Sequence, residues 1–191
     1  MNPKHLWRLS VSPLPIYVNK DWSLFLDRDG VINVRLIDEY VRHPDEFLLT
    51  FGTESAVRTF RAIFKYILVF TNQQGVAKGV MTMSDLEAVH AKMNKQLAGQ
   101  IDRIYACVHH RDEHCSCRKP NTKMLEMAKS EFPDIDFKKS LMVGDSRSDM
   151  IFGKRVGCVT VMVCATGQDP APEADYVVAS LSELVDRLVV Q

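Results

Sequence analysis

Six short apolar runs recur along this chain, and most are separated by stretches with helical spacing. The runs cover residues 22–26, 66–70, 104–108, 140–143, 159–163 and 176–178. Unbroken apolar runs indicate strands that are buried on both faces, as in a parallel sheet. The helical patterns cover residues 54–64, 84–97, 124–132 and 147–156, and a fifth follows Ser180. Strands that alternate with helices predict an α/β fold with right-handed crossovers.

The length of 191 residues suits one domain. We expect that domain to span residues 22–191, after an N-terminal arm over residues 1–21. We expect Trp7, Ile16 and Tyr17 to anchor the arm on the core. No apolar run is long enough to cross a bilayer, and the first residues lack the apolar segment of a signal peptide. The pattern therefore predicts a cytoplasmic protein with no membrane partner, and we expect a monomer.

The charges of the chain are balanced. Lys and Arg together number 24, and Asp and Glu together also number 24. Nucleic acid as the main partner would favour an excess of basic residues, so we expect no nucleic-acid partner. The balance leaves room for a local basic pocket.

Acidic and small polar residues come directly after three of the predicted strands. Asp27 and Asp29 follow the first, Thr71 and Asn72 follow the second, and Asp145 follows the fourth. In open α/β sheets, ligands bind beyond the carboxyl ends of the strands, so these side chains should share one edge. Three acids there would repel one another unless a cation lay between them, and hard oxygen ligands favour Mg²⁺. Each motif alone could instead be a solvated turn, a polar loop or a helix cap.

Further polar residues extend this pattern. Gln73 and Gln74 add uncharged donors that suit a phosphate oxygen or a substrate hydroxyl. Arg118 and Lys119 could neutralise a phosphate, the first through a two-point contact and the second as a point charge. Asp149 falls one turn into the helix that follows Asp145, where it would act behind the metal ligands.

Taken together, these segments resemble the four motifs of the haloacid dehalogenase (HAD) superfamily of phosphatases and phosphotransferases. The motifs are DRDGV at 27–31, Thr71, Lys119 and GDSRSD at 144–149, and the resemblance spans roughly residues 22–165. It implies a HAD-like Rossmannoid three-layer sandwich with a mostly parallel central sheet. No segment is long enough for a large cap domain, so residues 31–51 and a short zinc loop should form the walls of the pocket.

The resemblance also implies a role for each motif residue. Asp27 would be the nucleophile that forms an aspartyl phosphate. Asp29 would protonate the leaving oxygen and then activate water. Thr71 and Lys119 would bind the transferring phosphoryl group. The Asp27 side chain, the Asp29 backbone carbonyl and Asp145 would hold Mg²⁺, which with Lys119 would neutralise the phosphate dianion that Asp27 attacks.

A cluster of metal-ligating residues lies in the segment 107–117. Its pattern is C-x-H-x5-C-x-C, with Cys107, His109, Cys115 and Cys117. Three thiolates and one imidazole make a tetrahedral structural zinc site, and such a site would order a loop that has no core of its own. His110 and His114 are alternative ligands, and three free cysteines in a loop are the plain alternative. Cys158 and Cys164 lie in or beside an apolar strand, where we expect core residues.

The zinc loop continues into Arg-Lys-Pro and resembles two related HAD groups. The short x5 interval resembles the histidinol-phosphate phosphatase domain. DGVIN at 29–33, Tyr40-Val41, NQQGVAKG at 72–79 and the C-terminal ADYVV…SLSEL resemble the D,D-heptose 1,7-bisphosphate phosphatases. We favour the heptose group. By that resemblance, the substrate-contacting residues would be Asn72, Gln73, Gln74, Arg118 and Lys119.

The favoured resemblance implies a phosphoric monoester hydrolase with a small phosphorylated sugar as its substrate. It would be a Mg²⁺-dependent phosphatase that removes the 7-phosphate of D-glycero-D-manno-heptose 1,7-bisphosphate. The alternative is histidinol phosphate or another small sugar phosphate. Two other classes are a zinc-ordered interaction module without activity and a phosphatase of nucleic-acid ends. The intact acid set argues against the first, and the balanced charge argues against the second.

Overall fold

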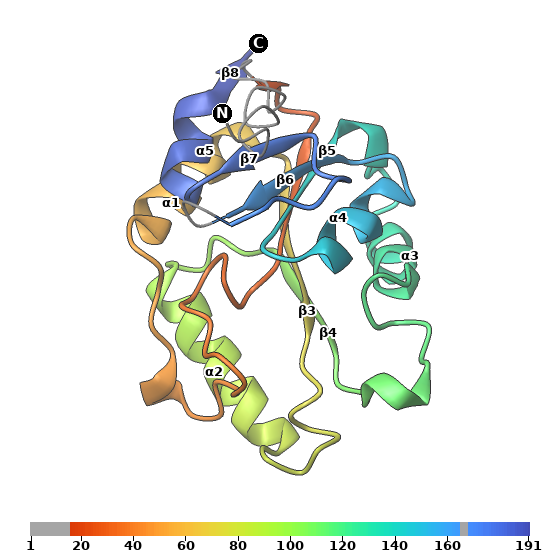
Figure 1. Cartoon of the computed structure of the whole chain (residues 1–191). Coiled ribbons are helices and arrows are strands. Elements are labelled where there is room, and N and C mark those ends of the chain that lie inside the picture. Colours follow the sequence, from red (N-terminus) through yellow and green to blue (C-terminus); the bar gives the residue numbers. More distant parts are fainter. Residues whose placement is uncertain (1–15, 165–167) are drawn as a thin grey trace, which may run out of the picture.

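A six-stranded, all-parallel sheet forms the middle layer of the computed structural model, which describes residues 16–164 and 168–191 (Figure 1). The strands are β2 (Ser23–Leu26), β3 (Tyr66–Asn72), β4 (Arg103–Cys107), β5 (Ser140–Gly144), β6 (Val159–Val163) and β7 (Tyr176–Val178). They lie in the order β4-β3-β2-β5-β6-β7. The chain thus builds one half of the sheet outward from β2 and then returns to build the other half from β5. All six predicted strands are confirmed.

Helices cover both faces of this sheet (Figure 1). The helices α1 (Thr53–Ile63), α2 (Met83–Gln96) and α5 (Leu181–Arg187) pack on one face, and α3 (Lys123–Glu131) and α4 (Arg147–Lys154) pack on the other. Successive strand residues point to opposite faces. Leu24 and Leu26 accordingly enter one buried core, and Phe25 between them enters the second. This arrangement confirms the predicted HAD-like three-layer sandwich.

Two short strands lie outside the main sheet and were missed by the sequence analysis. Ile16–Val18 (β1) pairs in parallel with Leu188–Val190 (β8). The predicted arm therefore contains a strand, and the last helix ends at Arg187, directly before β8 begins. Ile16 is buried and anchors the segment as expected, whereas Tyr17 is 53% exposed because alternate strand residues face outward. Trp7 lies outside the described residues.

The cavity walls come from short connecting segments. Residues 31–51 form a flap that contains the 3₁₀ turn η2 (Pro44–Glu46), and backbone hydrogen bonds from Val34 to Leu48 and from Thr50 to Ile32 hold it together. Residues 107–117 form a second loop around the 3₁₀ turn η3 (Arg111–Glu113). A third turn, η4 (Phe137–Lys139), precedes β5. Across the described ranges, no helix has both the length and the apolar character that a bilayer span requires.

The core between α1 and the sheet gives a stability prediction. Phe60 is fully buried and packs edge-to-face on Phe64. We expect Phe60→Ala to lower the free energy of unfolding by about 3–5 kcal/mol, through lost transfer energy and the cavity left behind. Phe51, which is 97% exposed, supplies the matched control, and Phe51→Ala should change stability by less than about 0.5 kcal/mol. Urea denaturation of both variants measures this, and equal losses would contradict the assigned core.

Candidate active site

Three carboxylates meet where the order of the sheet reverses, between β2 and β5. Asp27 follows β2, Asp145 follows β5, and Asp149 comes from the first turn of α4. One carboxylate oxygen of each lies within 4.8 Å of the others. Adjacent strands whose connections leave in opposite directions open a crevice at their carboxyl ends. The fold therefore brings together residues that are more than a hundred positions apart in the sequence.

Two glycines make room for these acids. Gly30 has a φ of +88°, and a Cβ added to it would lie 1.9 Å from Oδ2 of Asp145. A Cβ on Gly144 would lie 2.2 Å from Cβ of Asp149. Any larger residue at either position would push an acid away from the cluster. The glycines of the DRDGV and GDSRSD motifs are therefore required by close approach.

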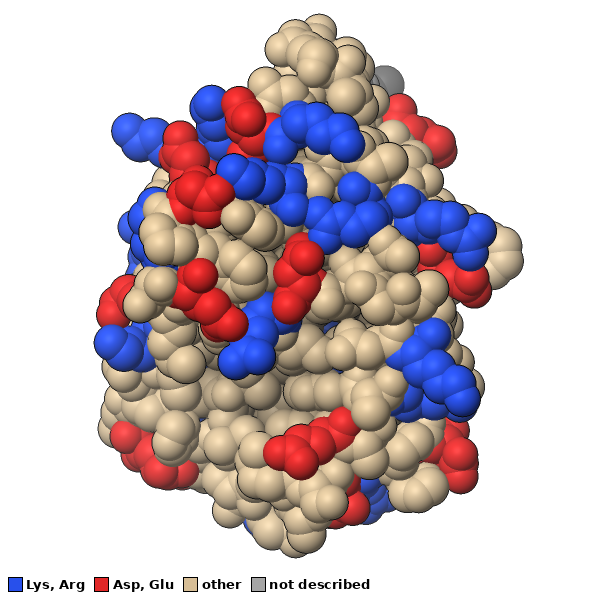
Figure 2. Space-filling model, turned by 180° about the vertical axis from the view of Figure 1, so that it is seen from behind, with Lys and Arg blue, Asp and Glu red and all other residues tan. Residues whose placement is uncertain are grey.

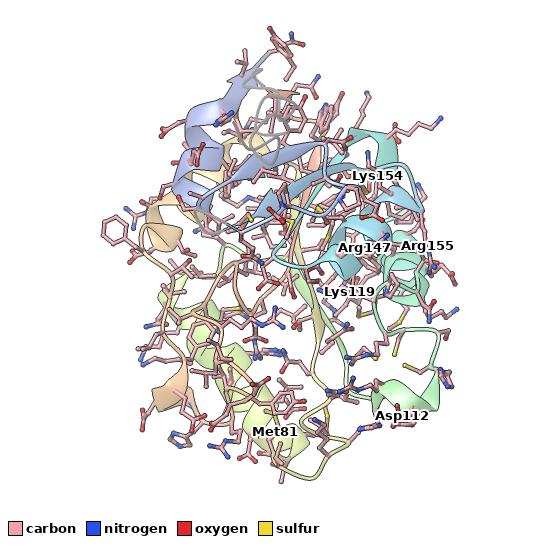
Figure 3. All side chains as sticks on the ribbon, in the orientation of Figure 1. Met81, Asp112, Lys119, Arg147, Lys154 and Arg155 are labelled. Carbon is pink, nitrogen blue, oxygen red and sulfur yellow. The ribbon has the colours of Figure 1, made fainter. Side chains whose placement is uncertain are left out.

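Lys119 is a buried cation at the centre of this cluster, and Figure 3 shows it in the middle of the molecule, below α4. Its Nζ lies 2.8 Å from Oδ1 of Asp27 and 2.5 Å from Oδ1 of Asp149, and it donates a hydrogen bond to the carbonyl of Phe70. Burial alone would lower the pKa of Lys119, but Asp149 and Asp27 outweigh burial and raise it. The side chain is therefore a fixed positive charge.

The charges around Asp27 are favourable for a metal ion. Burial and the carboxylate of Asp149 raise the pKa of Asp27 to about 7, although Lys119 opposes them. Burial also raises the pKa of Asp145, against the effect of Arg35. Oδ1 of Asp145 is buried and has no hydrogen-bond partner among the described residues. An oxygen-rich site with excess negative charge and an unpaired acceptor fits Mg²⁺.

Asp29 has very different surroundings from Asp27. It accepts hydrogen bonds from the side chains of Arg28, Asn33 and Gln73, at 2.9, 2.9 and 2.7 Å for the shortest contact of each. Burial opposes ionisation, but the Arg28 guanidinium and these hydrogen bonds hold the pKa of Asp29 below its usual range. Two carboxyl groups two residues apart thus have pKa values shifted in opposite directions, a pattern that separates the roles of two acids in a site.

A cavity of about 400 Å³ opens over the acids. Of the residues predicted to act, those that line it are Asp27, Asp29, Thr71, Asn72, Gln74, Arg118, Lys119 and Asp145. Gln73 is not among the described lining residues. It is buried, and its Nε2 bridges Oδ2 of Asp29 and Oγ1 of Thr71 at 2.7 Å each.

The flap and the zinc loop add charged residues to the cavity wall that the sequence analysis did not assign. Arg35 lies 2.9 Å from Oδ2 of Asp145, and Arg111 reaches the wall from η3. Lys78 lies over the ring of Tyr40, whose hydroxyl accepts a hydrogen bond from Gln74. Arg35 follows the first predicted strand, Lys78 the second and Arg111 the third. Their places after strands could have signalled this wall, but the approach of Arg35 depends on the folding of the flap.

The four predicted zinc ligands come together at the end of β4. Sγ of Cys107 lies 3.3 Å from Sγ of Cys115 and 2.9 Å from that of Cys117, and Nδ1 of His109 lies 3.2 Å from Sγ of Cys117. Burial raises the pKa of the Cys107 thiol. Thiolates packed this closely need a cation between them, so the set fits a tetrahedral zinc ion.

The other candidates for zinc ligands are placed elsewhere. His110 caps η3, where its Nδ1 accepts a hydrogen bond from the backbone of Asp112, and His114 ends that turn in a left-handed conformation. The cluster of ligand atoms found among the described residues contains neither of them. Cys158 and Cys164 are buried in the core, as predicted.

Both ends of the zinc loop are attached to the end of β3. The backbone N–H of Gln73 donates to the carbonyl of Cys107 at 2.7 Å. The side chain of Asn72 accepts from the backbone N–H of Lys119 at 3.0 Å and donates to its carbonyl at 3.3 Å. The loop therefore fixes the backbone from which Lys119 enters the site.

Comparisons with known proteins agree with this geometry. A model of HAD-hydrolase-like proteins matches residues 116–184. A Mycobacterium tuberculosis protein named D-glycero-alpha-D-manno-heptose-1,7-bisphosphate 7-phosphatase is 36% identical over 163 residues, which cover 81% of this chain and 86% of the relative. An Escherichia coli K12 protein, named for the beta anomer, is 35% identical and covers 85% and 91%. The chain belongs to the heptose-bisphosphate phosphatase family of HAD hydrolases.

A solved structure of the same family shares the fold. The crystal structure of the D,D-heptose 1,7-bisphosphate phosphatase from B. bronchiseptica, complexed with magnesium and phosphate, aligns with a TM-score of 0.77 at 31% identity. The alignment covers 86% of this chain and 96% of that one. A HAD-like phosphatase from Mesorhizobium loti aligns with a TM-score of 0.71 at 32% identity, covering 91% and 85%. The comparisons do not favour the histidinol-phosphate alternative.

The raised pKa of Asp27 gives a pH-dependent prediction for this phosphatase family member. Below pH 7 a proton competes with Mg²⁺ for the Asp27 carboxylate, so affinity should weaken as the pH falls. We expect Mg²⁺ to bind about tenfold more weakly near pH 6 than near pH 8, and binding should release a proton. Calorimetry in buffers of different ionisation enthalpy measures both effects. Asp27→Asn should bind more weakly without this pH dependence, and equal affinity of the wild-type protein at both pH values would contradict the assignment.

The zinc loop gives a second prediction. Metal analysis of the purified protein should find about one equivalent of zinc per chain, because the four ligands form one closed set. The double variant Cys115→Ser, Cys117→Ser should lose the zinc. Cys158→Ala is the matched control, since Cys158 is buried in the core and lies outside the cluster. Full zinc content in the double variant would refute this ligand set.

Proposed function

We propose that the chain is a Mg²⁺-dependent phosphatase that removes the 7-phosphate of D-glycero-D-manno-heptose 1,7-bisphosphate through an aspartyl-phosphate intermediate. The main support is the position of Asp27, a buried carboxylate that lies beside Lys119 and Asp145 in a cavity. The relatives that carry this substrate in their names cover most of the chain. A nucleophile beside a fixed cation, with room for a metal, is the arrangement that phosphoryl transfer requires.

Attack on phosphorus begins with Asp27. The backbone N–H of Arg28 donates to Oδ1 of Asp27 at 2.8 Å and orients the carboxylate. Lys119 and the hydroxyl of Thr71 bind the non-bridging oxygens of the phosphoryl group. The side chains of Asp27 and Asp145 and the Asp29 carbonyl would hold Mg²⁺, which would supply neutralisation of the phosphate charge. Asp27 can then displace the sugar oxygen and carry the phosphoryl group.

Asp29 handles the proton in both half-reactions. The arriving phosphate brings negative charge next to Asp29, which favours its protonated form and lets it protonate the leaving sugar oxygen. Departure of the sugar returns Asp29 to the carboxylate form that its hydrogen-bond partners stabilise. That carboxylate then takes a proton from the water that hydrolyses the aspartyl phosphate.

The cavity wall suits a substrate with a second phosphate. Arg118, Arg111 and Lys78 line the cavity, and Asp38 and Glu39 line it as well. Nη1 of Arg118 is buried and has no hydrogen-bond partner among the described residues, so it can donate to a ligand oxygen. On the face shown in Figure 2, basic and acidic side chains are interspersed, which supports a small charged substrate rather than nucleic acid.

We also propose that the chain acts in the cytoplasm as a monomer. Three cysteines gathered into a set that fits a metal, without a disulfide among the described cysteines, suit a reducing compartment. All of the proposed site residues come from one chain, so no second copy is needed to complete the site. Size-exclusion chromatography with light scattering would test the oligomeric state.

Phosphate release distinguishes the candidate substrates. We expect heptose 1,7-bisphosphate to be hydrolysed with a kcat/KM at least about a hundredfold above that of histidinol phosphate. The reason is that Arg118, Arg111 and Lys78 line the cavity and can bind a second phosphate. Both anomers should be assayed, since the relatives are named for one or the other. Equal and low turnover of all these compounds would refute the substrate assignment.

Two substitutions test the mechanism with the preferred substrate. Asp27→Asn should abolish activity, because the amide cannot form the phosphoenzyme. Asp29→Asn should lower kcat by about 10²–10⁴-fold through loss of acid–base catalysis. Circular dichroism and zinc content confirm folding. A near-wild-type rate in either variant would exclude the assigned role of that residue.

A further inference from the structure

Arg28 is a fully buried cation in the catalytic turn, and the reaction described above does not use its side chain. It lies between the nucleophile Asp27 and the acid–base residue Asp29, but it is not one of the described residues that line the cavity. Burial of a guanidinium costs free energy unless a well-placed group of opposite charge pairs with it. The position of Arg28 therefore calls for a specific partner.

That partner is Asp29. Nη2 of Arg28 lies 2.9 Å from both carboxylate oxygens of Asp29, and Nε lies 3.3 Å from Oδ1. Asn33 and Gln73 each donate one further hydrogen bond to the same carboxylate. The planar guanidinium fixes the plane of the carboxylate more strictly than a lysine could. Asp29 is thus held in one orientation by groups behind it.

His90 holds the other end of the guanidinium. It lies on α2, and its Nε2 is 3.3 Å from Nη1 of Arg28. Arginine has only donors, so Nε2 of His90 must be the acceptor and the ring proton must sit on Nδ1. Burial and the nearby charge of Arg28 lower the pKa of His90 to about 4, which agrees with a neutral ring.

We propose that Arg28 and His90 are positioning residues that hold Asp29 in place to protonate the leaving oxygen of the substrate. The inference rests on the proposed function, since it takes Asp29 as the acid–base group. His90 fixes Arg28 from α2, and Arg28 fixes the carboxylate. A misplacement of about 1 Å in a reacting group can cost about a hundredfold in rate, so a residue remote from the substrate can control this step.

The leaving group separates this role from a merely structural one. The primary alkoxide of a sugar phosphate leaves poorly and needs the proton from Asp29, whereas p-nitrophenolate leaves without one. The ratio kcat/KM covers the steps up to departure of the leaving group and excludes the later hydrolysis of the phosphoenzyme. A misplaced Asp29 should therefore lower kcat/KM for the alkyl phosphate and spare it for the aryl phosphate.

The experiment compares His90→Leu, which removes the acceptor, with His90→Gln, which keeps one, on heptose 1,7-bisphosphate and p-nitrophenyl phosphate. We expect His90→Leu to lower kcat/KM at least about tenfold for the sugar phosphate and less than about twofold for the aryl phosphate. His90→Gln should recover most of the loss. Glu87→Leu, at an exposed position one turn earlier on α2, is the control and should match the wild-type protein on both substrates.

Equal losses of kcat/KM on both substrates, or no loss on either, would overturn the inference. If His90→Leu does not fold, as judged by thermal unfolding and zinc content, Arg28→Lys replaces it, because it keeps the charge and loses the two-point contact. The same selective loss is expected from that variant. A wild-type protein that releases phosphate from neither compound would instead refute the proposed function, so the two failures are distinguishable.

Discussion

The buried ammonium of Lys119 between Asp27 and Asp149 is the interaction on which the site depends. Without that cation, three carboxylates within 4.8 Å of one another could not all remain charged at the end of a buried sheet. Several parts of the fold serve to place it. Asn72 binds its backbone, the zinc loop precedes it, and the serine at the start of α4 holds Asp149 by donating from its backbone and its hydroxyl.

The pair Asp27 and Asp29 shows how one turn can provide two chemically different carboxyl groups. Asp27 is buried beside other acids, and burial and those acids raise its pKa, so that it gains most from a metal ion. Asp29 is also buried, but it faces donors that outweigh burial and lower its pKa. The difference arises because the two carboxyl groups contact different partners: Asp27 lies beside Lys119 and Asp149, whereas Asp29 is surrounded by donors from Arg28, the flap and the turn after β3. The spacing of the two acids places both in one turn, but it is their different surroundings that shift their pKa values in opposite directions.

Much of the fold and part of the site could be predicted because the signals were local. Apolar runs marked the six strands of the sheet, and the polar residues after them marked its carboxyl edge. The missed features depend on contacts between distant segments. Arg35 approaches Asp145 across 110 positions, and Arg28 meets His90 across 62. Gln73 and Gln74 are identical neighbours in the sequence. In the structure, however, Gln73 is buried and donates to Asp29, whereas Gln74 lines the cavity. Sequence patterns contain no information on which way such a side chain turns once the backbone has closed around it.

The pairing of β1 with β8 has a consequence for how the molecule comes apart. The first and last described strands bond to each other, at the amino edge of the sheet and opposite the cavity, since β1 leads through a short turn into the start of β2. The path from residue 16 to residue 191 is therefore nearly a closed ring, in which neither β1 nor β8 can detach without losing its pairing with the other. Opening of β1 and opening of β8 become one cooperative event, and it takes place at the edge where no catalytic side chain is disturbed.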